Sequence, residues 1–438
     1  MAAGLESDAD VATCAIVGGG PAGLVLGLLL ARGGIRVTVL EKHADFLRDF
    51  RGDTVHPSTL GMLDDLGLFE RFDGLPQSRV RQFRVPTADG SDVVLADLDR
   101  LPVRHPYIAM VPQWDLLDLL AAAAEDEPTF TLLREHEVTG VLREGGRVRG
   151  VTHRSPDGEK ELRADLTVAC DGRWSVVRRA VGFPVREFRV PFDVWWFRIT
   201  TARQLAEALL PRIRRGRIGI AIPRRGYVQV AWIGRKGADA ALRAAGIDAF
   251  RAEVAELLPD LADDVHTIAS MDDVKHLDVR LNRLRRWHAN GVLCIGDAAH
   301  AMSPAGGVGI NLAVQDAVAT ARLLAAPLRD GALAGPGPAR VLARVQRRRR
   351  FPSIAIQTLQ RVVLARVIAP VIAGRTEVVV PRIAGILLRR LRGLSVVPAF
   401  VIGVGPRPER VPGWARRGGT RRRRQANRAR RRGRISAP

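Results

Sequence analysis

Three glycines mark the first place in the chain where residue types and spacing indicate chemistry. Gly18, Gly20 and Gly23 form a Gly-x-Gly-x-x-Gly pattern, with Pro21 and Ala22 between them. The first glycine permits a tight turn, the second lets the backbone approach a pyrophosphate, and the third lets a helix pack closely on a strand. The N-terminus of that helix would offer free N–H groups and a partial positive charge to phosphates.

An acidic residue follows at the distance that this motif requires. Glu41 comes 18 residues after Gly23, at the end of a second apolar run, and Lys42 is next. A carboxylate there can accept hydrogen bonds from ribose hydroxyls, and it disfavours a 2′-phosphate. Residues 12–42 therefore predict a βαβ unit that binds a dinucleotide. The alternative is a glycine-rich turn in an unrelated α/β protein.

Two further apolar runs end in a similar way. Residues 166–170 stop at Asp171, and residues 291–295 stop at Gly296 and Asp297. In an open α/β sheet the carboxyl ends of parallel strands share one edge, and ligands bind outside that edge. We therefore expect the three turns to meet around one ligand.

The chain after Asp297 completes a resemblance to a known family. The third pattern continues through Pro304, Gly307, Gly309, Ile310 and Asn311. In this order and spacing, the three patterns resemble the para-hydroxybenzoate hydroxylase family of FAD-dependent monooxygenases (group A flavoprotein hydroxylases) over about residues 10–412. The resemblance implies an α/β fold: a glutathione-reductase-type, Rossmann-like FAD-binding domain with an inserted mixed β-sheet substrate domain and a helical C-terminus. It is much less specific for the substrate.

The resemblance also implies which residues hold the cofactor. Asp297 would bind the ribitol or its neighbouring phosphate, and Pro304 would lie near the flavin ring. Arg51 falls where the family has an arginine near the pyrophosphate, and Gln113 matches a family glutamine that contacts FAD. The implied cofactor-binding residues are Gly18, Gly20, Pro21, Ala22, Gly23, Glu41, Lys42, Arg51, Gln113, Asp171, Gly296, Asp297, Pro304, Gly307, Gly309, Ile310 and Asn311.

Most of the implied chemistry belongs to the cofactor. In the family, NAD(P)H binds transiently and reduces FAD, O2 adds at the flavin C4a, and the distal oxygen passes to an electron-rich carbon, usually of a phenol-like ring. The protein has to exclude water. No catalytic base is assigned, and only Arg51 and Pro304 are expected near the flavin ring. A helix beginning near Gly309 would stabilise negative charge on the flavin by about 1–2 kcal/mol.

The region between the second and third turns has the pattern of an inserted sheet. Strands are expected at residues 194–200, 217–222 and 227–233, and a helix at residues 249–258. We expect an aromatic substrate between this sheet and the flavin, with His56, Trp195, Phe197 and Trp232 as candidate contacts. Alternation puts Trp195 and Phe197 on one face and Trp196 on the other. One face should line the site and the other should pack under a helix, and a purely structural role for both stays open.

The positive charge is concentrated at one end of the chain. Residues 340–438 hold 26 arginines against two glutamates, so they account for more than the whole net charge of +22. Clustered cations could bind a membrane surface or nucleic acid, but the basic runs after residue 420 offer no aromatic side chains for base stacking. We expect a solvated tail with no specific nucleic acid, and peripheral membrane contact through residues 368–404 as the alternative. Deleting residues 414–438 should then leave the FAD content unchanged.

These patterns divide the chain into four parts. We expect a discontinuous FAD-binding domain at residues 10–75, 103–184 and 277–330, a substrate domain at 76–102 and 185–276, a basic helical region at 340–406, and a disordered Arg-rich tail at 407–438.

Composition excludes several classes of protein. With 438 residues, 47% of them hydrophobic and 26% charged, the chain suits a globular protein of about two to three domains. Three cysteines without metal-site spacing exclude a disulfide scaffold, offer no metal site and favour a reducing, cytoplasmic location. Residues 11–31 carry no charge and are long enough to span a bilayer, but their glycines and Pro21 break them into a strand, a turn and a helix.

Other activities of the same fold are weighed against hydroxylation. A flavin-dependent halogenase typically needs Trp-x-Trp-x-Ile-Pro and a catalytic lysine, whereas residues 195–200 do not match and the chain has only four lysines. An epoxidase or a reductase stays open, and oxygen dependence would separate a monooxygenase from the reductase. Among single residues, we expect His300 to be hydrogen bonded rather than a base, Ser175 to cap a helix, and Asp171 either to serve the cofactor or to pair with Arg178.

Overall fold

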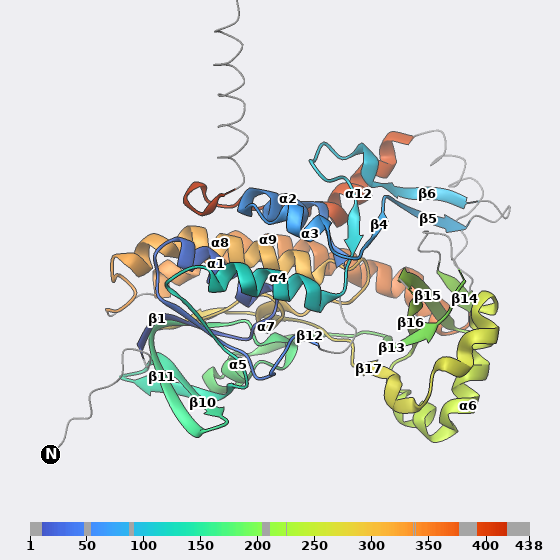
Figure 1. Cartoon of the computed structure of the whole chain (residues 1–438), viewed down its shortest axis with the longest axis horizontal. Coiled ribbons are helices and arrows are strands. Elements are labelled where there is room, and N and C mark those ends of the chain that lie inside the picture. Colours follow the sequence, from blue (N-terminus) through green and yellow to red (C-terminus); the bar gives the residue numbers. More distant parts are fainter. Residues whose placement is uncertain are drawn as a thin grey trace, which may run out of the picture.

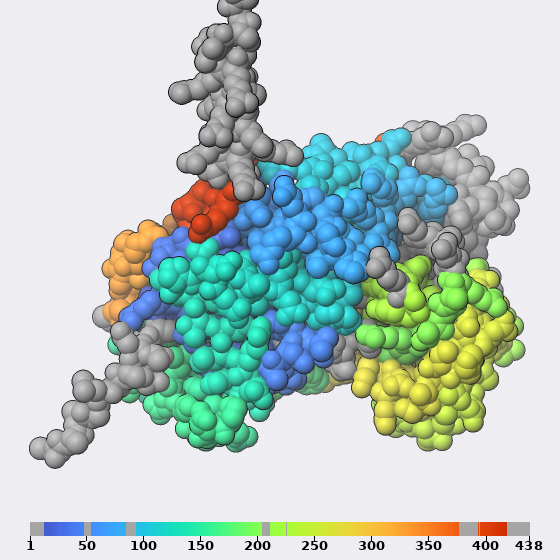
Figure 2. All heavy atoms as spheres, in the orientation of Figure 1, coloured from blue at the N-terminus to red at the C-terminus, as the bar shows by residue number. Residues whose placement is uncertain are grey.

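Two sheets lie side by side along the long axis of the molecule (Figure 1). The computed structural model describes residues 11–47, 54–86, 92–203, 211–224, 226–335, 337, 339–375 and 392–417. Within these residues the larger sheet is mostly parallel and the smaller one is antiparallel. In Figure 2 the smaller sheet and its helix, coloured green to yellow, form a lobe beside the blue and teal N-terminal half.

The parallel sheet is built from the apolar runs that the sequence analysis singled out. Its strands have the order β19 (His288–Ala289), β20 (Val292–Cys294), β11 (Gly158–Ala169), β1 (Val11–Val17), β2 (Val37–Leu40) and β8 (Phe130–Leu133). All neighbours from β20 to β8 run parallel, and β10 (Arg147–Ser155) and β9 (Glu137–Glu144) extend β11 in antiparallel pairing. With α1 (Pro21–Arg32) between β1 and β2, the predicted βαβ unit is confirmed.

Four helices form a layer above this sheet in the view of Figure 1. They are α1, α4 (Gln113–Glu125), α8 (Gly309–Arg329) and α9 (Ala339–Val363). The helix predicted near residues 310–324 is thus confirmed as α8. α1 packs against both α4 and α8, and α8 packs against α9. Because α1 is apolar on all sides and almost entirely buried, it belongs to the core that the sheet and the outer helices enclose.

The antiparallel sheet comes from the predicted insertion. Its order is β14 (Arg212–Arg214), β15 (Arg217–Arg224), β16 (Tyr227–Arg235), β13 (Phe192–Thr200) and β17 (Lys275–Leu277). α6 (Asp239–Leu257) covers one face. The prediction started this helix at residue 249, whereas the structure starts it at Asp239 and kinks it at Gly246, whose φ is +83°. Glycine tolerates that angle, so the chain bends there and continues as helix.

Residues 76–102 do not join the antiparallel sheet. β4 (Ser78–Val80) pairs with β7 (Ile108–Met110), which also pairs with β3 (Thr54–Val55). β5 (Gln82–Pro86) and β6 (Asp92–Asp97) form a separate hairpin, and β12 (Val185–Phe188) pairs with β18 (Leu281–Leu284). The division into domains stays a prediction.

Short helices connect these strands and the long helices. They are α2 (Pro57–Leu66), α3 (Phe69–Asp73), α5 (Val176–Val181), α7 (Asp297–His300), α10 (Ala369–Ile372) and α12 (Val396–Gly403). Turns of 3-10 or π helix lie at residues 98–100, 172–174, 259–267, 271–273, 364–368, 392–395 and 413–415.

The C-terminal region differs from the prediction at its boundary. Disorder was expected from residue 407, but residues 407–417 are held in place: Glu409 pairs with Arg322 and Arg348, and Arg417 pairs with Glu127. The partners lie far away in the sequence, so the composition of the tail did not reveal them. The rest of the tail, residues 418–438, and the middle of the segment 368–404, residues 376–391, lie outside the described residues.

One helical stretch, residues 339–372, is long and apolar enough to cross a membrane by length and composition alone. Core helices of globular proteins pass the same test, and 28% of its most apolar window is buried inside the molecule. Leu342, Val345, Ile356 and Leu364 belong to its hydrophobic core. Membrane contact therefore stays a prediction.

Candidate functional site

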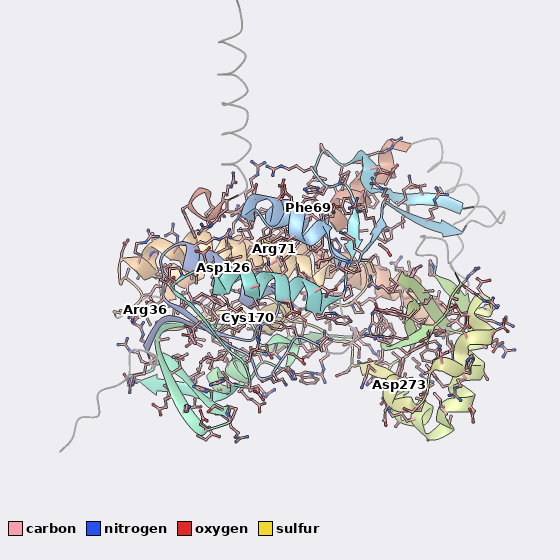
Figure 3. The ribbon with its side chains drawn as sticks, in the orientation of Figure 1. Arg36, Phe69, Arg71, Asp126, Cys170 and Asp273 are labelled. Atoms are coloured by element: carbon pink, nitrogen blue, oxygen red, sulfur yellow. The ribbon has the colours of Figure 1, made fainter. Side chains whose placement is uncertain are left out.

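Four strands of the parallel sheet end side by side. Val17 pairs with Leu40 on one side and with Ala169 on the other, and Ala169 pairs with Cys294. The residues that follow these strand ends are therefore neighbours, as predicted for the three turns. Cys170, labelled in Figure 3, marks the edge at the end of β11. Ligands of open α/β sheets bind outside such an edge.

In the glycine turn after β1, a side chain would clash at Gly18 and Gly23 but would fit at Gly20. A Cβ on Gly18, whose φ is +99°, would lie 2.7 Å from the Cys170 carbonyl oxygen. A Cβ on Gly23 would lie 2.0 Å from the Gly18 carbonyl oxygen. At Gly20 it would meet nothing within 4 Å. Gly20 precedes Pro21 at the start of α1, and no side chain caps this helix. The space at Gly20 and the helix N-terminus form a cradle that suits a pyrophosphate.

Glu41 fastens this turn to the end of β2. Its side chain is only 2% exposed. One carboxylate oxygen accepts a hydrogen bond from the Gly19 N–H at 2.9 Å, and the other accepts from the His43 N–H at 3.1 Å. Since each carboxylate oxygen can accept more than one hydrogen bond, the predicted contact with ribose is compatible with these bonds. Lys42, beside it, is exposed.

Asp171 occupies the N-terminus of α5. Its Oδ2 accepts hydrogen bonds from the N–H groups of Val176 and Val177, at 2.7 and 3.3 Å. Its Oδ1 is buried and has no hydrogen-bond partner among the residues described. Burial raises the pKa of this carboxyl group. A buried oxygen without a partner at this edge can accept a hydrogen bond from a ligand, so the residues present fit a bound nucleotide.

Two further expectations for this turn are settled by the hydrogen bonds of α5. The Ser175 hydroxyl accepts from the Arg178 N–H at 2.9 Å, so Ser175 caps the helix as predicted. The guanidinium of Arg178 donates to the carbonyl oxygens of Arg173 and Ala298, at 2.6 and 3.3 Å. The guanidinium of Arg178 therefore has backbone carbonyl partners. The alternative in which it pairs with Asp171 is not observed, because Asp171 accepts from backbone N–H groups at the start of α5 instead.

The third turn is held by a buried carboxylate. The N–H of Gly296, whose φ is +58°, donates to Asp316 Oδ2 at 3.1 Å. The same oxygen lies 2.5 Å from Nε2 of His300. The prediction that His300 is hydrogen bonded is confirmed. Asp297 starts α7 with its carboxylate 3.6 Å from Arg173 and about a third exposed, so it remains available to a ligand.

Side chains of residues 54–59 hold the loop before α8 and the first turn of α8 by hydrogen bonds. The carbonyl oxygen of Gly307 accepts from the Thr54 hydroxyl at 2.9 Å and lies 2.9 Å from His56 Nε2. The side-chain oxygen of Asn311 accepts from Ser58 and Thr59, at 2.6 and 2.9 Å. α8 starts at Gly309, as predicted, without a side-chain cap. Its N-terminal N–H groups are thus left without a side-chain partner, as the predicted role toward the flavin requires.

His56 does not have the role predicted for it. The side chain is fully buried, and its Nδ1 lies 2.8 Å from the Ile402 carbonyl oxygen in α12. Since both ring nitrogens face backbone carbonyls, His56 joins α12 to the Gly307 loop and is not a substrate contact. Burial lowers its pKa to about 4.

The other substrate candidates were assigned to the wrong face of the antiparallel sheet. Trp195, Phe197 and Trp232 share a buried cluster with Phe250 and Val254 of α6. They are core residues, and the opposite face carries Trp196. The choice could not be made from β13 alone, because α6 decides which face is covered. On that opposite face the structure adds Gln229 and Arg224, which were missed.

The remaining predicted cofactor residues lie at or just before the starts of helices. Gln113 is the first residue of α4, Pro304 is half-buried in the loop before α8, and Ile310 is half-buried in the first turn of α8. Arg51 lies outside the described residues. Burial raises the pKa of Cys14, Cys170 and Cys294, which suits inert core thiols.

Comparisons with known proteins agree with this geometry. The profile of a family described as "FAD binding domain" matches residues 10–352. A 6-methylpretetramide 4-monooxygenase of Streptomyces rimosus is 35% identical over 330 residues, which are 72% of this chain and 75% of that protein. A para-nitrophenol 4-monooxygenase of Pseudomonas sp. strain WBC-3 is 27% identical over 72% of this chain and 78% of its own. The solved anhydrotetracycline hydroxylase OxyS of Streptomyces rimosus has a TM-score of 0.69 and 25% identity, covering 90% of this chain and 76% of its own.

Proposed function

Because the chain belongs to the FAD-binding-domain family of FAD-dependent aromatic monooxygenases, we propose that its substrate is a polycyclic phenol. The enzyme is an oxidoreductase that uses NAD(P)H and O2. In the net reaction one oxygen atom enters a ring C–H bond, the other leaves as water, and NAD(P)H supplies the two electrons. A relative named for 6-methylpretetramide at 35% identity and a solved structure named for anhydrotetracycline support this substrate class.

The convergence of the strand ends is the observation that carries the FAD-dependent part of this proposal. Gly20 and the start of α1 offer backbone N–H groups to the pyrophosphate, and Glu41 and Asp171 Oδ1 offer acceptors to hydroxyl groups. When bound there, FAD supplies electron transfer from NAD(P)H and activation of O2. The N-terminus of α8, which has no side-chain cap, would stabilise negative charge on a ring bound beside it by about 1–2 kcal/mol.

The apolar surroundings give the chain its second task, which is to exclude water. Met302, Val308 and Leu312, in and beside the loop before α8, share one buried cluster with Ala231 of β16. This cluster packs the loop before α8, residues 301–308, against the antiparallel sheet. A reacting ring held there would be shielded from solvent. Excluding water keeps activated oxygen from being released as hydrogen peroxide before it reaches the ring.

The test uses the full chain. The purified protein should show flavin absorption or take up added FAD. 6-Methylpretetramide should accelerate NAD(P)H oxidation more than p-nitrophenol, and isotopically labelled O2 should deliver one labelled oxygen to the product. Faster turnover of p-nitrophenol would overturn the substrate class. Consumption of NAD(P)H with no labelled product would overturn hydroxylation, and turnover without O2 would favour the reductase. A cytoplasmic location stays a prediction.

A further inference from the structure

The antiparallel sheet turns the face opposite α6, which is apolar with a few polar groups, toward the loop before α8, residues 301–308. Alternation along β13 and β16 sends Trp196 and Gln229 to the face opposite α6. Gln229 pairs with Arg198 on one side and with Ile222 on the other. Two residues along β16, Ala231 belongs to the cluster that contains Met302 and Val308. This face therefore lies where a substrate would sit between sheet and flavin.

Gln229 is held in one orientation. It is 1% exposed, and its Oε1 accepts from Arg224 Nε and Nη2 at 3.3 and 3.2 Å. A guanidinium can only donate hydrogen bonds, so the amide oxygen must be the atom that faces Arg224. Arg224 is itself anchored, because its Nη1 donates to the Met110 carbonyl oxygen. The amide nitrogen is consequently directed away from Arg224.

Gln229 Nε2 is buried and lacks a hydrogen-bond partner in the described part of the chain. Arg198, its neighbour on β13, stacks on the Tyr227 ring at 4.9 Å and offers no acceptor. Buried donors are nearly always paired in native proteins. Two N–H groups fixed in direction and left unpaired point to an acceptor that is supplied from outside the chain.

A second donor lies on the same face. Trp196 Nε1 is also buried without a partner among the residues that the structure describes. Trp196 pairs with Ala231, so it is diagonal to Gln229 across the two strands. Its ring touches both the cluster of Val308 and the cluster of Ala399 in α12. The indole can thus supply an apolar wall and one hydrogen bond to the same ligand.

We propose that Gln229 Nε2, with Trp196 Nε1 beside it, binds an acceptor oxygen of the substrate, a ring carbonyl or phenolate oxygen. The two donors are neutral, and the positive charges of Arg224 and Arg198 flank them. The face therefore selects an oxygen that carries negative charge and discriminates against rings without one. This inference rests on the proposed function and adds the residue that determines specificity.

The experiment compares variants of the full-length holoenzyme. Gln229→Met removes the donors with little change of size, and Gln229→Glu keeps an acceptor for Arg224 but replaces the donor nitrogen with oxygen. For each variant, binding of 6-methylpretetramide is measured by perturbation of the flavin spectrum, and KM and kcat by NAD(P)H oxidation. We expect Kd and KM to rise about 10-fold to 100-fold, which is the loss of one to two hydrogen bonds, with unchanged FAD content.

A matched pair on neighbouring positions supplies the control. Trp196→Phe removes the second donor and should raise KM, whereas Trp195→Phe on the α6 face should lower thermal stability and leave KM unchanged. Trp195 Nε1 already donates to Asp239 at 2.7 Å. The Gln229 variants should also lose the wild-type preference for a phenol over its deoxy analogue.

The outcomes separate this inference from the proposed function. Unchanged Kd, KM and preference in folded Gln229 and Trp196 variants would overturn it, because water or another part of the chain would then satisfy the donors. If Gln229→Met does not fold, Gln229→Glu and Trp196→Phe decide. A flavin-loaded wild type that neither binds nor turns over any phenol would contradict the proposed function itself, and the inference with it.

Discussion

Arg349 and Asp316 form an ion pair in which both side chains are fully buried, with 2.8 Å between Arg349 Nε and Asp316 Oδ1. The pair joins α9 to α8. Asp316 also holds the Gly296 turn and His300 with its other oxygen. Burial alone would raise the pKa of Asp316, but His300 and Arg349 hold it below its ordinary value. The C-terminal helix thereby supports a turn of the cofactor site from the side away from the ligand.

Removing one partner of this pair should be costly. In Arg349→Met the Asp316 carboxylate stays buried without the guanidinium and keeps only His300 beside it, and we expect a loss of about 3–5 kcal/mol in unfolding free energy. Chemical denaturation of the holoenzyme measures this loss. FAD affinity should fall as well, because the Gly296 turn loses its support.

Two variants control that prediction. Arg154→Met breaks an exposed pair with Glu159 and should cost less than about 1 kcal/mol. The double variant Asp316→Asn with Arg349→Met removes both charges and should recover part of the lost stability. An Arg349→Met protein as stable as the wild type would show that the pair contributes little.

The glycine turn gives a prediction with opposite outcomes at two positions three residues apart. At Gly20 a methyl group meets no atom of the described residues within 4 Å, so Gly20→Ala should fold with nearly normal stability. The methyl would occupy the space left for the pyrophosphate, and FAD affinity should fall by at least about 10-fold. Fluorescence titration of the apoprotein with FAD measures this.

Gly23→Ala should lower the stability of the fold itself, whereas Gly20→Ala should lower FAD affinity. Its Cβ would lie 2.0 Å from the Gly18 carbonyl oxygen, so helix and strand must separate, at a cost of about 1–3 kcal/mol or more. Thermal denaturation of the apoprotein separates the two variants. Equal FAD affinity in Gly20→Ala and wild type would mean that the phosphates bind elsewhere.

The cofactor edge was predictable because its signals are local. Apolar runs specify buried parallel strands, and the glycines after them have steric reasons that act within a few residues, as Gly18 and Gly23 show. The order and spacing of three such turns then indicated one shared edge. What the local pattern could not reveal was the orphaned Oδ1 of Asp171, which depends on the packing of α5.

The face of the antiparallel sheet was not predictable for a corresponding reason. β13 carries aromatic residues on both faces, Trp195 on one and Trp196 on the other, so alternation gives two equivalent solutions. The choice depends on α6, whose first half before Gly246 was not recognised as helix. In the same way, the order of residues 407–417 depends on Arg322 and Arg348 pairing with Glu409, contacts between segments far apart in sequence.

Truncation of the C-terminus should show where its contribution to stability ends. Arg32 donates to the Ala415 carbonyl oxygen at 3.0 Å, and Arg417 pairs with Glu127 at 2.9 Å. Deleting residues 414–438 removes both contacts, so it should lower the unfolding free energy by about 1–3 kcal/mol, whereas the FAD content is expected to stay unchanged. Deleting only residues 418–438 keeps them. Melting curves that coincide for the two truncated proteins would show that the docked segment contributes nothing.

His56 should make the fold sensitive to acid. Burial lowers its pKa to about 4, whereas in the unfolded chain a histidine titrates near about 6.5. Between these pH values the unfolded state binds a proton that the folded state does not. The contribution of neutral His56 to the unfolding free energy is therefore complete above about pH 6.5 and is lost as the pH falls toward 4, by about 3 kcal/mol in all.

The unfolding free energy measured against pH tests this. It should fall more gently with decreasing pH in His56→Gln than in the wild type. His266→Gln, at an exposed histidine, is the matched control for replacing a histidine by glutamine. Parallel curves for wild type and His56→Gln would assign the acid sensitivity to other groups.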